Sequence, residues 1–158
     1  MLLRIIAVGT RMPGWVGSAV SDYSARMPGE FSLEWREIKA EPRGSSGSRA
    51  VWLQREAERI GAAIPPSAWR VILDERGRDV STQELARRLS HWREQAKPVA
   101  LLIGGPDGLA PELRQSANET LRLSSLTLAH PLVRVLLAEQ LFRAWSILSG
   151  HPYHRDGP

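Results

Sequence analysis

Val99-Ala100-Leu101-Leu102-Ile103-Gly104-Gly105-Pro106-Asp107-Gly108-Leu109 is an apolar run that ends in a glycine-rich turn. A strand without polar residues is typical of a parallel sheet that helices cover on both faces. Ligands bind such sheets at the carboxyl ends of the strands, where glycine lets them approach the backbone. The turn has neither Gly-Lys-Ser/Thr nor GxGxxG, the common phosphate-binding motifs. It is therefore either a ligand-binding turn or a plain connection from strand to helix.

The rest of the chain alternates strand-like and helix-like segments, which is typical of an α/β domain. The sequence predicts strands at residues 2–8, 33–38, 69–73, 99–103 and 126–128, and helices at 15–27, 50–64, 132–148, after a capping box of Ser81 with Glu84, and from Pro111 onward. Residues 40–48, rich in glycine, serine and proline, are expected to form a loop. We expect a single domain over residues 1–158, with a parallel sheet and helices on both faces.

The composition limits the class of protein. No cysteine occurs among the 158 residues, which excludes a disulfide framework and thiolate metal sites. No metal-ligand cluster is evident, so we expect no metal. The opening MLLRIIAVGT is a short apolar run for a signal peptide, and no stretch reaches the roughly 18 apolar residues of a membrane span. We expect a cytoplasmic protein without a membrane partner.

The charge balance bears on the partner. Lys and Arg total 21 against 17 Asp and Glu, and lysine appears only at Lys39 and Lys97. Guanidinium groups bind phosphate and stack on bases. The arginine bias is compatible with a nucleic-acid partner, but a GC-rich genome would produce the same bias.

A second candidate site is Leu123-Ser124-Ser125-Leu126-Thr127-Leu128-Ala129-His130-Pro131, a short hydroxyl-bearing segment before a long helix. Its backbone could hydrogen-bond an adenosyl group while the leucines pack on the rings. Alternatively it is an edge strand, and His130 is a capping or packing residue. Leu73-Asp74-Glu75-Arg76-Gly77-Arg78 is another strand end that could face the same pocket.

The helix predicted at 132–148 is apolar around most of its circumference, so it must be buried on more than one side. The sheet can cover one side, and a second subunit is a natural cover for the other. The directions of Arg134 and Arg143 around this helix differ by half a turn, so the two side chains point in opposite directions. Because buried arginine is rarely unpaired, at least one should contact a carboxylate, a phosphate or a chain terminus.

The tail His151-Pro152-Tyr153-His154-Arg155 contains two imidazoles, a phenol and a guanidinium. Such groups can accept a proton, stack on a base and hold a phosphate. A disordered polar tail is the simpler interpretation.

Taken together, the chain closely resembles one family over essentially its whole length: the bacterial large-subunit ribosomal RNA pseudouridine N3-methyltransferases of the knotted SPOUT superfamily. The resemblance rests on several blocks in family order and spacing. They are Ala7-Val8-Gly9 with Trp15, LDERGR at 73–78, LLIGGPDGL at 101–109, LTLAHPLVRVLLAEQLFRAWSI at 126–147 and HPYHR at 151–155. One position departs: Ala129 stands where the family commonly has proline, which removes no functional group.

The resemblance implies a C-terminal deep trefoil knot that holds S-adenosylmethionine. It also implies a homodimer that acts on assembled 70S ribosomes and methylates N3 of a pseudouridine in helix 69 of 23S RNA. Carried over to this chain, the cofactor-binding residues would be Leu73, Gly104, Leu123, Ser124, Ser125, Leu126, Thr127 and Leu128, with Gly105 beside them.

The mechanism requires the N3 proton of the uracil ring to leave, so the protein must position the ring and remove that proton. His130, Tyr153 and His154 are the candidates for this step, and Arg155 is a candidate for holding phosphate; the sequence does not choose among them. The alternatives are a non-catalytic ribosome-binding or assembly factor with the same fold, and a knotted methyltransferase acting on tRNA. A small-molecule hydrolase has less support, because no paired carboxylates or nucleophile elbow occur.

Overall fold

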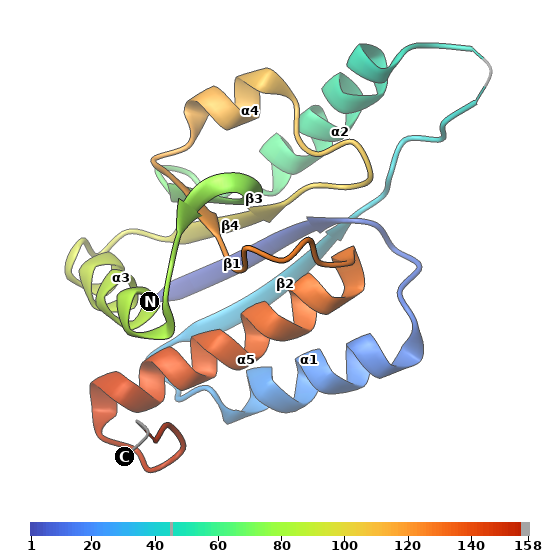
Figure 1. Cartoon of the computed structure of the whole chain (residues 1–158). Helices are drawn as coiled ribbons and strands as arrows, with labels where there is room; N and C mark the ends of the chain where they lie inside the picture. The colour runs from blue at the N-terminus through green and yellow to red at the C-terminus, as the bar shows by residue number, and fades with distance from the viewer. Residues whose placement is uncertain (45, 156–158) are drawn as a thin grey trace.

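A five-stranded parallel sheet in the order β2-β1-β4-β3-β5 forms the centre of the computed structural model, which describes residues 1–44 and 46–155 (Figure 1). Strands and helices alternate along the chain: β1 (Leu2–Val8), α1 (Gly14–Arg26), β2 (Ser32–Ile38), α2 (Arg49–Ala63), β3 (Trp69–Asp79), α3 (Thr82–Glu94), β4 (Val99–Ile103), α4 (Pro111–Ser116), β5 (Glu119–Arg122) and α5 (His130–Ser149). The predicted α/β class with a parallel sheet is confirmed.

The apolar strands lie where the sequence predicts. β1 and β4 pair in the middle of the sheet, with Ile5 opposite Leu101, and all five residues of β4 are buried. A strand with neighbours on both edges and helices on both faces has no polar environment for side chains, so β4 contains only Val, Ala, Leu and Ile.

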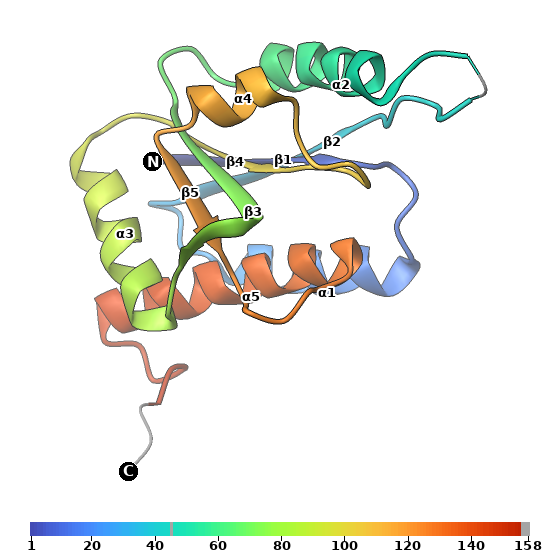
Figure 2. The ribbon, with the colours of Figure 1, turned by 45° about the horizontal axis from the view of Figure 1, so that its top comes forward.

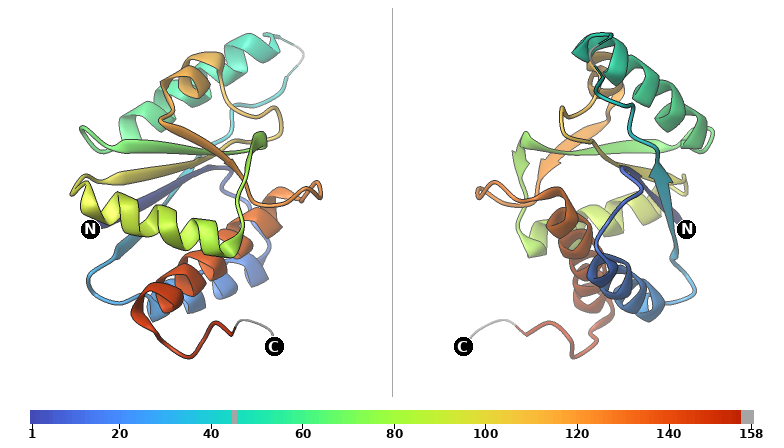
Figure 3. Two further views of the ribbon diagram at one scale, coloured as in Figure 1. Left: turned by 60° about the vertical axis from the view of Figure 1, so that its left-hand side comes forward. Right: turned by 90° about the vertical axis from the view of Figure 1, so that its right-hand side faces the viewer.

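Helices cover both faces of the sheet. Successive side chains of a strand point to opposite faces, so Leu3 and Ile5 of β1 pack in the core cluster with α3 and α5, whereas Ile6 and Val8 pack in the cluster with α2 and α4. Figure 2 shows α1 and α5 on one side of the sheet and α2 and α4 on the other. Figure 3 shows α3 beside α5.

One predicted strand is wrong. Residues 126–128 form no strand; the fifth strand is β5, which pairs with β3. Leu126 and Thr127 are exposed, and the Leu126 amide donates to the Ser124 hydroxyl at 2.9 Å, a local bond that competes with strand pairing. β3 is longer than predicted, because residues beyond Leu73 pair with β5 again after a register shift.

The helix ends follow their sequence signals. Ser81 caps α3 by accepting a hydrogen bond from the Glu84 amide at 3.1 Å, and Pro111 occupies the first turn of α4. Gly150 ends α5 in a left-handed conformation, with φ of 72°, and turns the chain back along the helix. In the part of the chain that the structure describes, no helix combines the length and apolar character needed to span a membrane.

Candidate functional site

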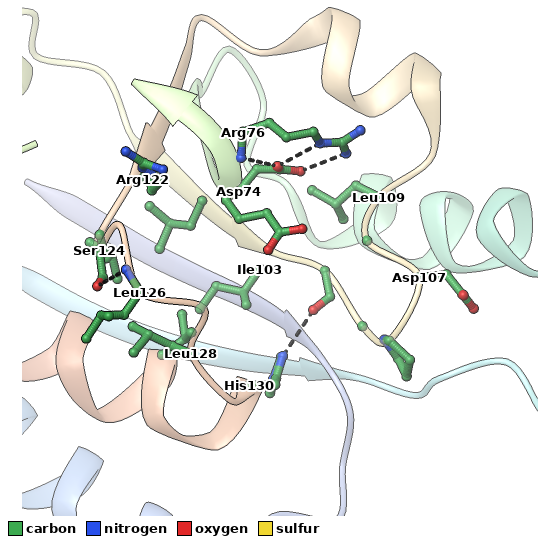
Figure 4. A pocket seen from close by; sticks show the side chains of 18 of the residues that line it. Asp74, Arg76, Ile103, Asp107, Leu109, Arg122, Ser124, Leu126, Leu128 and His130 are labelled. Carbon is green, nitrogen blue, oxygen red and sulfur yellow. Dashed lines mark hydrogen bonds and ion pairs between the residues drawn. The ribbon is translucent and has the colours of Figure 1, made fainter. Parts of the chain in front are cut away.

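A cavity of about 520 Å³ opens at the carboxyl ends of β3, β4 and β5, where open α/β sheets bind ligands (Figure 4). Its size suits a cofactor or small ligand. The predicted glycine turn, the ends of β3 and β5, and the segment leading into α5 form its walls. The lining residues are Arg49, Leu73, Asp74, Glu75, Arg76, Ile103, Gly104, Gly105, Pro106, Asp107, Gly108, Leu109, Arg122, Leu123, Ser124, Leu126, Leu128, His130 and Val133.

The structure brings together most of the residues expected to bind the cofactor. Seven of the nine line this cavity: Leu73, Gly104, Gly105, Leu123, Ser124, Leu126 and Leu128. The other two, Ser125 and Thr127, are exposed and do not appear among the lining residues.

The glycines of the turn are there because the backbone folds tightly on itself. The Gly108 amide donates to the Gly105 carbonyl at 3.0 Å, and Gly108 has φ of 79°, which favours glycine. A Cβ on Gly104 would lie 2.6 Å from the Gly108 backbone, and one on Gly105 would lie 2.9 Å from a methyl of Val8. Neither position can take a side chain without moving the turn.

His130 supports this turn from the start of α5. Its Nδ1 lies 3.0 Å from the Gly104 carbonyl, and its Nε2 accepts a hydrogen bond from Arg134 at 2.9 Å. Arginine can only donate, so Nδ1 carries the proton and donates to Gly104. Burial and the charge of Arg134 lower the pKa of His130, which keeps the ring neutral.

Arg134 is itself buried and fully engaged. Its guanidinium pairs with Glu37 of β2 at 2.6 Å and donates to the Gly9 carbonyl at 2.8 Å. This confirms that a buried arginine of α5 meets a carboxylate. The hydrogen bonds from Arg134 to Glu37 and to His130 therefore connect β2 to the cavity wall.

The cavity rim carries both signs of charge. Asp74 accepts from the side chain and backbone of Arg76, and the side-chain hydrogen bond is the main reason that the pKa of Asp74 is lowered. Arg49 and Arg122 also line the cavity. A rim of mixed charge can accommodate a ligand that carries an ammonium and a carboxylate.

The predicted catalytic residues of the tail gather elsewhere, around Glu139 of α5. One oxygen of Glu139 accepts from Arg143 at 2.7 Å and from the Tyr153 hydroxyl at 3.1 Å, and Arg143 lies 3.2 Å from Nδ1 of His154. Burial, together with the neighbouring Tyr23 and Glu139, raises the pKa of Tyr153 to about 12. Arg155 is exposed.

Within one chain the tail does not reach the cavity. His130 and Arg134 precede Glu139 and Arg143 by nine residues each, about two and a half helical turns, which places the two pairs on opposite faces of α5. The tail residues therefore lie about 14 Å along the helix from His130 and on the other side of it. The structure does not join His130 to Tyr153, His154 and Arg155.

The sequence did not indicate three residues that lie at the cavity or at the tail. Arg49 and Arg122 reach the cavity from the start of α2 and the end of β5. Glu139 holds the Tyr153 hydroxyl of the tail, a contact that the sequence did not indicate. Neither arginine had a local signal, because Arg122 ends the unpredicted strand β5 and Arg49 begins a helix that is distant in sequence.

The sheet, glycine turn and leucine-lined cavity together define an α/β protein with a ligand site at the carboxyl ends of its strands. A solved probable methylase family protein from Haemophilus influenzae Rd KW20 has a TM-score of 0.55 and 16% identity, covering 99% of this chain and 71% of that one. A probable methyltransferase from Bordetella pertussis Tohama I also has a TM-score of 0.55, with 20% identity, covering 90% of this chain and 95% of that one. Both share the fold.

Residues 1–154 match the family described as "Predicted SPOUT methyltransferase", and the chain belongs to this family. Its members use S-adenosylmethionine. The chain is 56% identical to "Ribosomal RNA large subunit methyltransferase H" of Bordetella pertussis over 155 residues, 98% of this chain and 99% of the relative. It is 53% identical over 156 residues to the protein of the same name from Acidovorax ebreus, covering 99% of this chain and all of that one. The resemblance inferred from the sequence blocks is confirmed.

Proposed function

We propose that this chain methylates N3 of a pseudouridine in helix 69 of 23S ribosomal RNA, with S-adenosylmethionine as methyl donor, as a homodimer on the assembled 70S ribosome in the cytoplasm. The observation that carries the proposal is the cavity between the Gly104–Gly108 turn and the Leu123–Leu128 segment, in a chain that matches large-subunit RNA methyltransferases from end to end.

The cavity fits the cofactor chemically. Leu126 is 74% exposed at the mouth of the cavity. An adenine ring packed on Leu126, Leu123 and Leu128 would cover it, and backbone groups of Gly104 and Gly105 would pair with the polar atoms of the cofactor. The cofactor-binding set is then Leu73, Gly104, Gly105, Leu123, Ser124, Ser125, Leu126, Thr127 and Leu128, the two exposed residues Ser125 and Thr127 contributing through their backbone.

The cofactor supplies an activated methyl group, so the side chains have two tasks: to orient the uracil ring and to take its N3 proton. His130 is poorly suited to take the proton, since Nε2 already accepts a hydrogen bond and its pKa is lowered. We assign it to the support of the glycine turn.

The remaining groups are those of the tail. A phenol with a pKa of about 12 stays protonated at neutral pH, so Tyr153 orients the ring by hydrogen bonding and does not act as the base. His154 is then the candidate proton acceptor, and its Nδ1 must exchange the 3.2 Å contact with Arg143 for the N3 proton. Arg155 is exposed and can meet a phosphate. The cofactor would supply the methyl group that replaces the N3 proton, and His154 would take that proton.

A dimer would bring the tail to a cavity. Three large apolar side chains are exposed on α1 and α5: Trp15 at 52%, Leu132 at 44% and Leu136 at 37%. Leu132 and Leu136 are one helical turn apart, so they form one patch on the first half of α5. We infer that a second copy covers this patch, and that the tail of one protomer completes the cavity of the other.

The trefoil knot belongs to the same proposal, as does the treatment of residues 1–158 as one domain. Supporting the knot, the end of β3 lies against β5: a Cβ on Gly77 would be 2.7 Å from the Leu121 backbone, and Arg78 pairs with Leu121. Figure 3 shows this part of β3 crossing the segment that leads to α5.

Calorimetry with S-adenosylmethionine, followed by transfer of labelled methyl groups to ribosomes or to tRNA, tests the proposal. We expect cofactor binding and labelling of 23S RNA in ribosomes only. No cofactor binding would favour a ribosome-binding factor that keeps the fold, and labelling of tRNA would favour a tRNA enzyme.

A further inference from the structure

Arg43 lies in the loop between β2 and α2 and connects two carboxylates that are distant in sequence. Its Nε and one terminal nitrogen reach Asp107 of the glycine turn at 3.1 and 3.0 Å, and its other terminal nitrogen pairs with Glu56 of α2. It also donates to the Glu41 carbonyl at 2.6 Å, and its guanidinium lies 5.5 Å from the centre of the Trp52 ring. A planar guanidinium with five donors suits this double bridge, which the point charge of lysine cannot reproduce.

Glu56 makes this bridge more than a surface ion pair. It is 1% exposed, and the oxygen that pairs with Arg43 also accepts from the Glu41 amide at 2.8 Å. Its other oxygen is 3.9 Å from the place where a Cβ of Gly105 would lie, so the carboxylate stands against the turn. A buried carboxylate without its partner is strongly unfavourable, so Arg43 is fixed in place.

The glycine turn is thus supported on two sides. His130 holds the Gly104 carbonyl, and Arg43 holds the Asp107 carboxylate. Both supports begin at the carboxyl end of β2, through Glu37 on one side and the chain leading to Arg43 on the other. The turn itself is rich in glycine and would adopt several shapes without external contacts.

We propose that Arg43 is a positioning residue for the cofactor: by tying Asp107 to Glu56, it holds residues 104–108 in the shape that binds S-adenosylmethionine. This inference rests on the proposed function of the cavity. Arg43 does not itself line the cavity, and its donors are engaged within the protein, so it acts through the turn and not by contacting RNA.

The test replaces Arg43 with lysine (R43K) in the full chain. We expect the Kd for S-adenosylmethionine to rise about tenfold or more, because the turn must be ordered on binding. The KM for ribosomes should change less than about twofold, because Arg43 does not contact the RNA. Hydrogen–deuterium exchange of the 104–109 segment should increase in the cofactor-free protein.

Arg59→Lys is the matched control. Arg59 lies in α2, the helix that carries Glu56, and binds Glu41 and the Lys39 carbonyl without reaching the turn. Its substitution should leave the cofactor Kd and the exchange of residues 104–109 unchanged. If R43K and R59K affect both measurements equally, Arg43 has only a general structural role and the proposal is wrong.

Two further outcomes are separable. If the unaltered chain binds no S-adenosylmethionine, the proposed function fails, whereas normal binding together with unchanged R43K binding overturns only the role of Arg43. If R43K does not fold, Asp107→Asn keeps the Arg43–Glu56 pair and cuts the link to the turn. Faster exchange at residues 104–109 in cofactor-free D107N would then support the proposal, and unchanged exchange would refute it.

Discussion

At Gly104 the absence of one carbon atom determines the shape of the cavity. An added Cβ would lie 2.6 Å from the Gly108 backbone, which cannot move away as a flexible side chain could. We predict that Gly104→Ala opens the turn and raises the Kd for S-adenosylmethionine at least about tenfold, equivalent to about 1.4 kcal/mol. Isothermal titration calorimetry measures this directly.

Gly61→Ala provides the control for this change. Gly61 lies in α2, and a Cβ there would meet no atom within 4 Å. Alanine should stabilise the helix by roughly 0.5–1 kcal/mol and leave cofactor binding unaltered. Equal cofactor affinity in the two variants would show that the close approach at Gly104 is not needed.

His130 gives the protein a pH-dependent contact. Its pKa is lowered, by burial and by Arg134, so the folded state binds this proton less tightly than the unfolded chain does. The stabilisation by neutral His130 is therefore complete above its ordinary pKa of 6.5 and is lost as the pH falls from there toward the folded value.

Asparagine at this position does not titrate and can still donate to the Gly104 carbonyl. We predict that the unfolding free energy of the unaltered protein falls more steeply below pH 6.5 than that of His130→Asn. Urea unfolding at a series of pH values measures both slopes. Parallel curves would mean that His130 keeps the same proton affinity in both states.

At the scale of elements, the short strand β5 is held by a single carboxylate. Glu119 accepts from the indoles of Trp69 in β3 and Trp92 in α3, at 2.5 and 2.7 Å, and from Arg88 at 2.6 Å. Burial alone raises the pKa of Glu119, but these hydrogen bonds outweigh it and the net pKa is lowered. The carboxylate is therefore ionised and bonded in the folded protein.

We predict that Glu119→Gln lowers the unfolding free energy by about 1–3 kcal/mol at neutral pH, because Arg88 loses its charged partner. The lowered pKa means that this contribution is present above the ordinary value of 4.5 and disappears as the pH falls through the folded value. The unfolding free energies of the unaltered protein and of Glu119→Gln should therefore become equal at acid pH. Glu30→Gln, at an exposed ion pair of 3.9 Å, should change stability little at any pH.

The sequence predicted those elements whose pattern is local. The apolar run 99–103 and the glycine turn after it lie where expected, because burial on both faces leaves a clear composition. The strand expected at 126–128 was wrong, since a leucine-rich segment at a cavity mouth has the same composition as a strand. β5 was missed because its stability comes from Trp69, Trp92 and Arg88, which no local pattern reveals.

The site was predictable to a similar extent. The leucines and glycines of the cavity follow strand ends, which mark ligand sites in α/β sheets. The bridge from Arg43 to Asp107 spans 64 residues, so sequence spacing could not indicate it. Nor could it indicate that the tail and His130 lie on opposite faces of α5 within one chain.

At the scale of the whole molecule, a mixed dimer tests whether the tail acts across the interface. One protomer carries Gly104→Ala and an intact tail; the other carries an intact cavity with Tyr153→Phe and His154→Ala. If the tail works in trans, the mixed dimer contains one complete site, and we predict up to about half the activity of the unaltered dimer.

Each homodimer of these two variants serves as the control and should be much less active, provided that the cofactor concentration is kept below the raised Kd of Gly104→Ala. Methyl incorporation into ribosomes, measured on tandem-tagged mixed dimers, gives the answer. Activity no higher than in the controls would place tail and cavity in the same protomer and contradict the proposed arrangement.

The most direct test of the methyltransferase assignment is mass spectrometry of ribosomal RNA from cells that lack this protein. We predict that one pseudouridine in helix 69 of the 23S RNA has lost a methyl group, and that the unaltered chain restores it whereas Gly104→Ala does not. A helix 69 that keeps its full methylation without the protein would contradict the assignment of this chain as its methyltransferase.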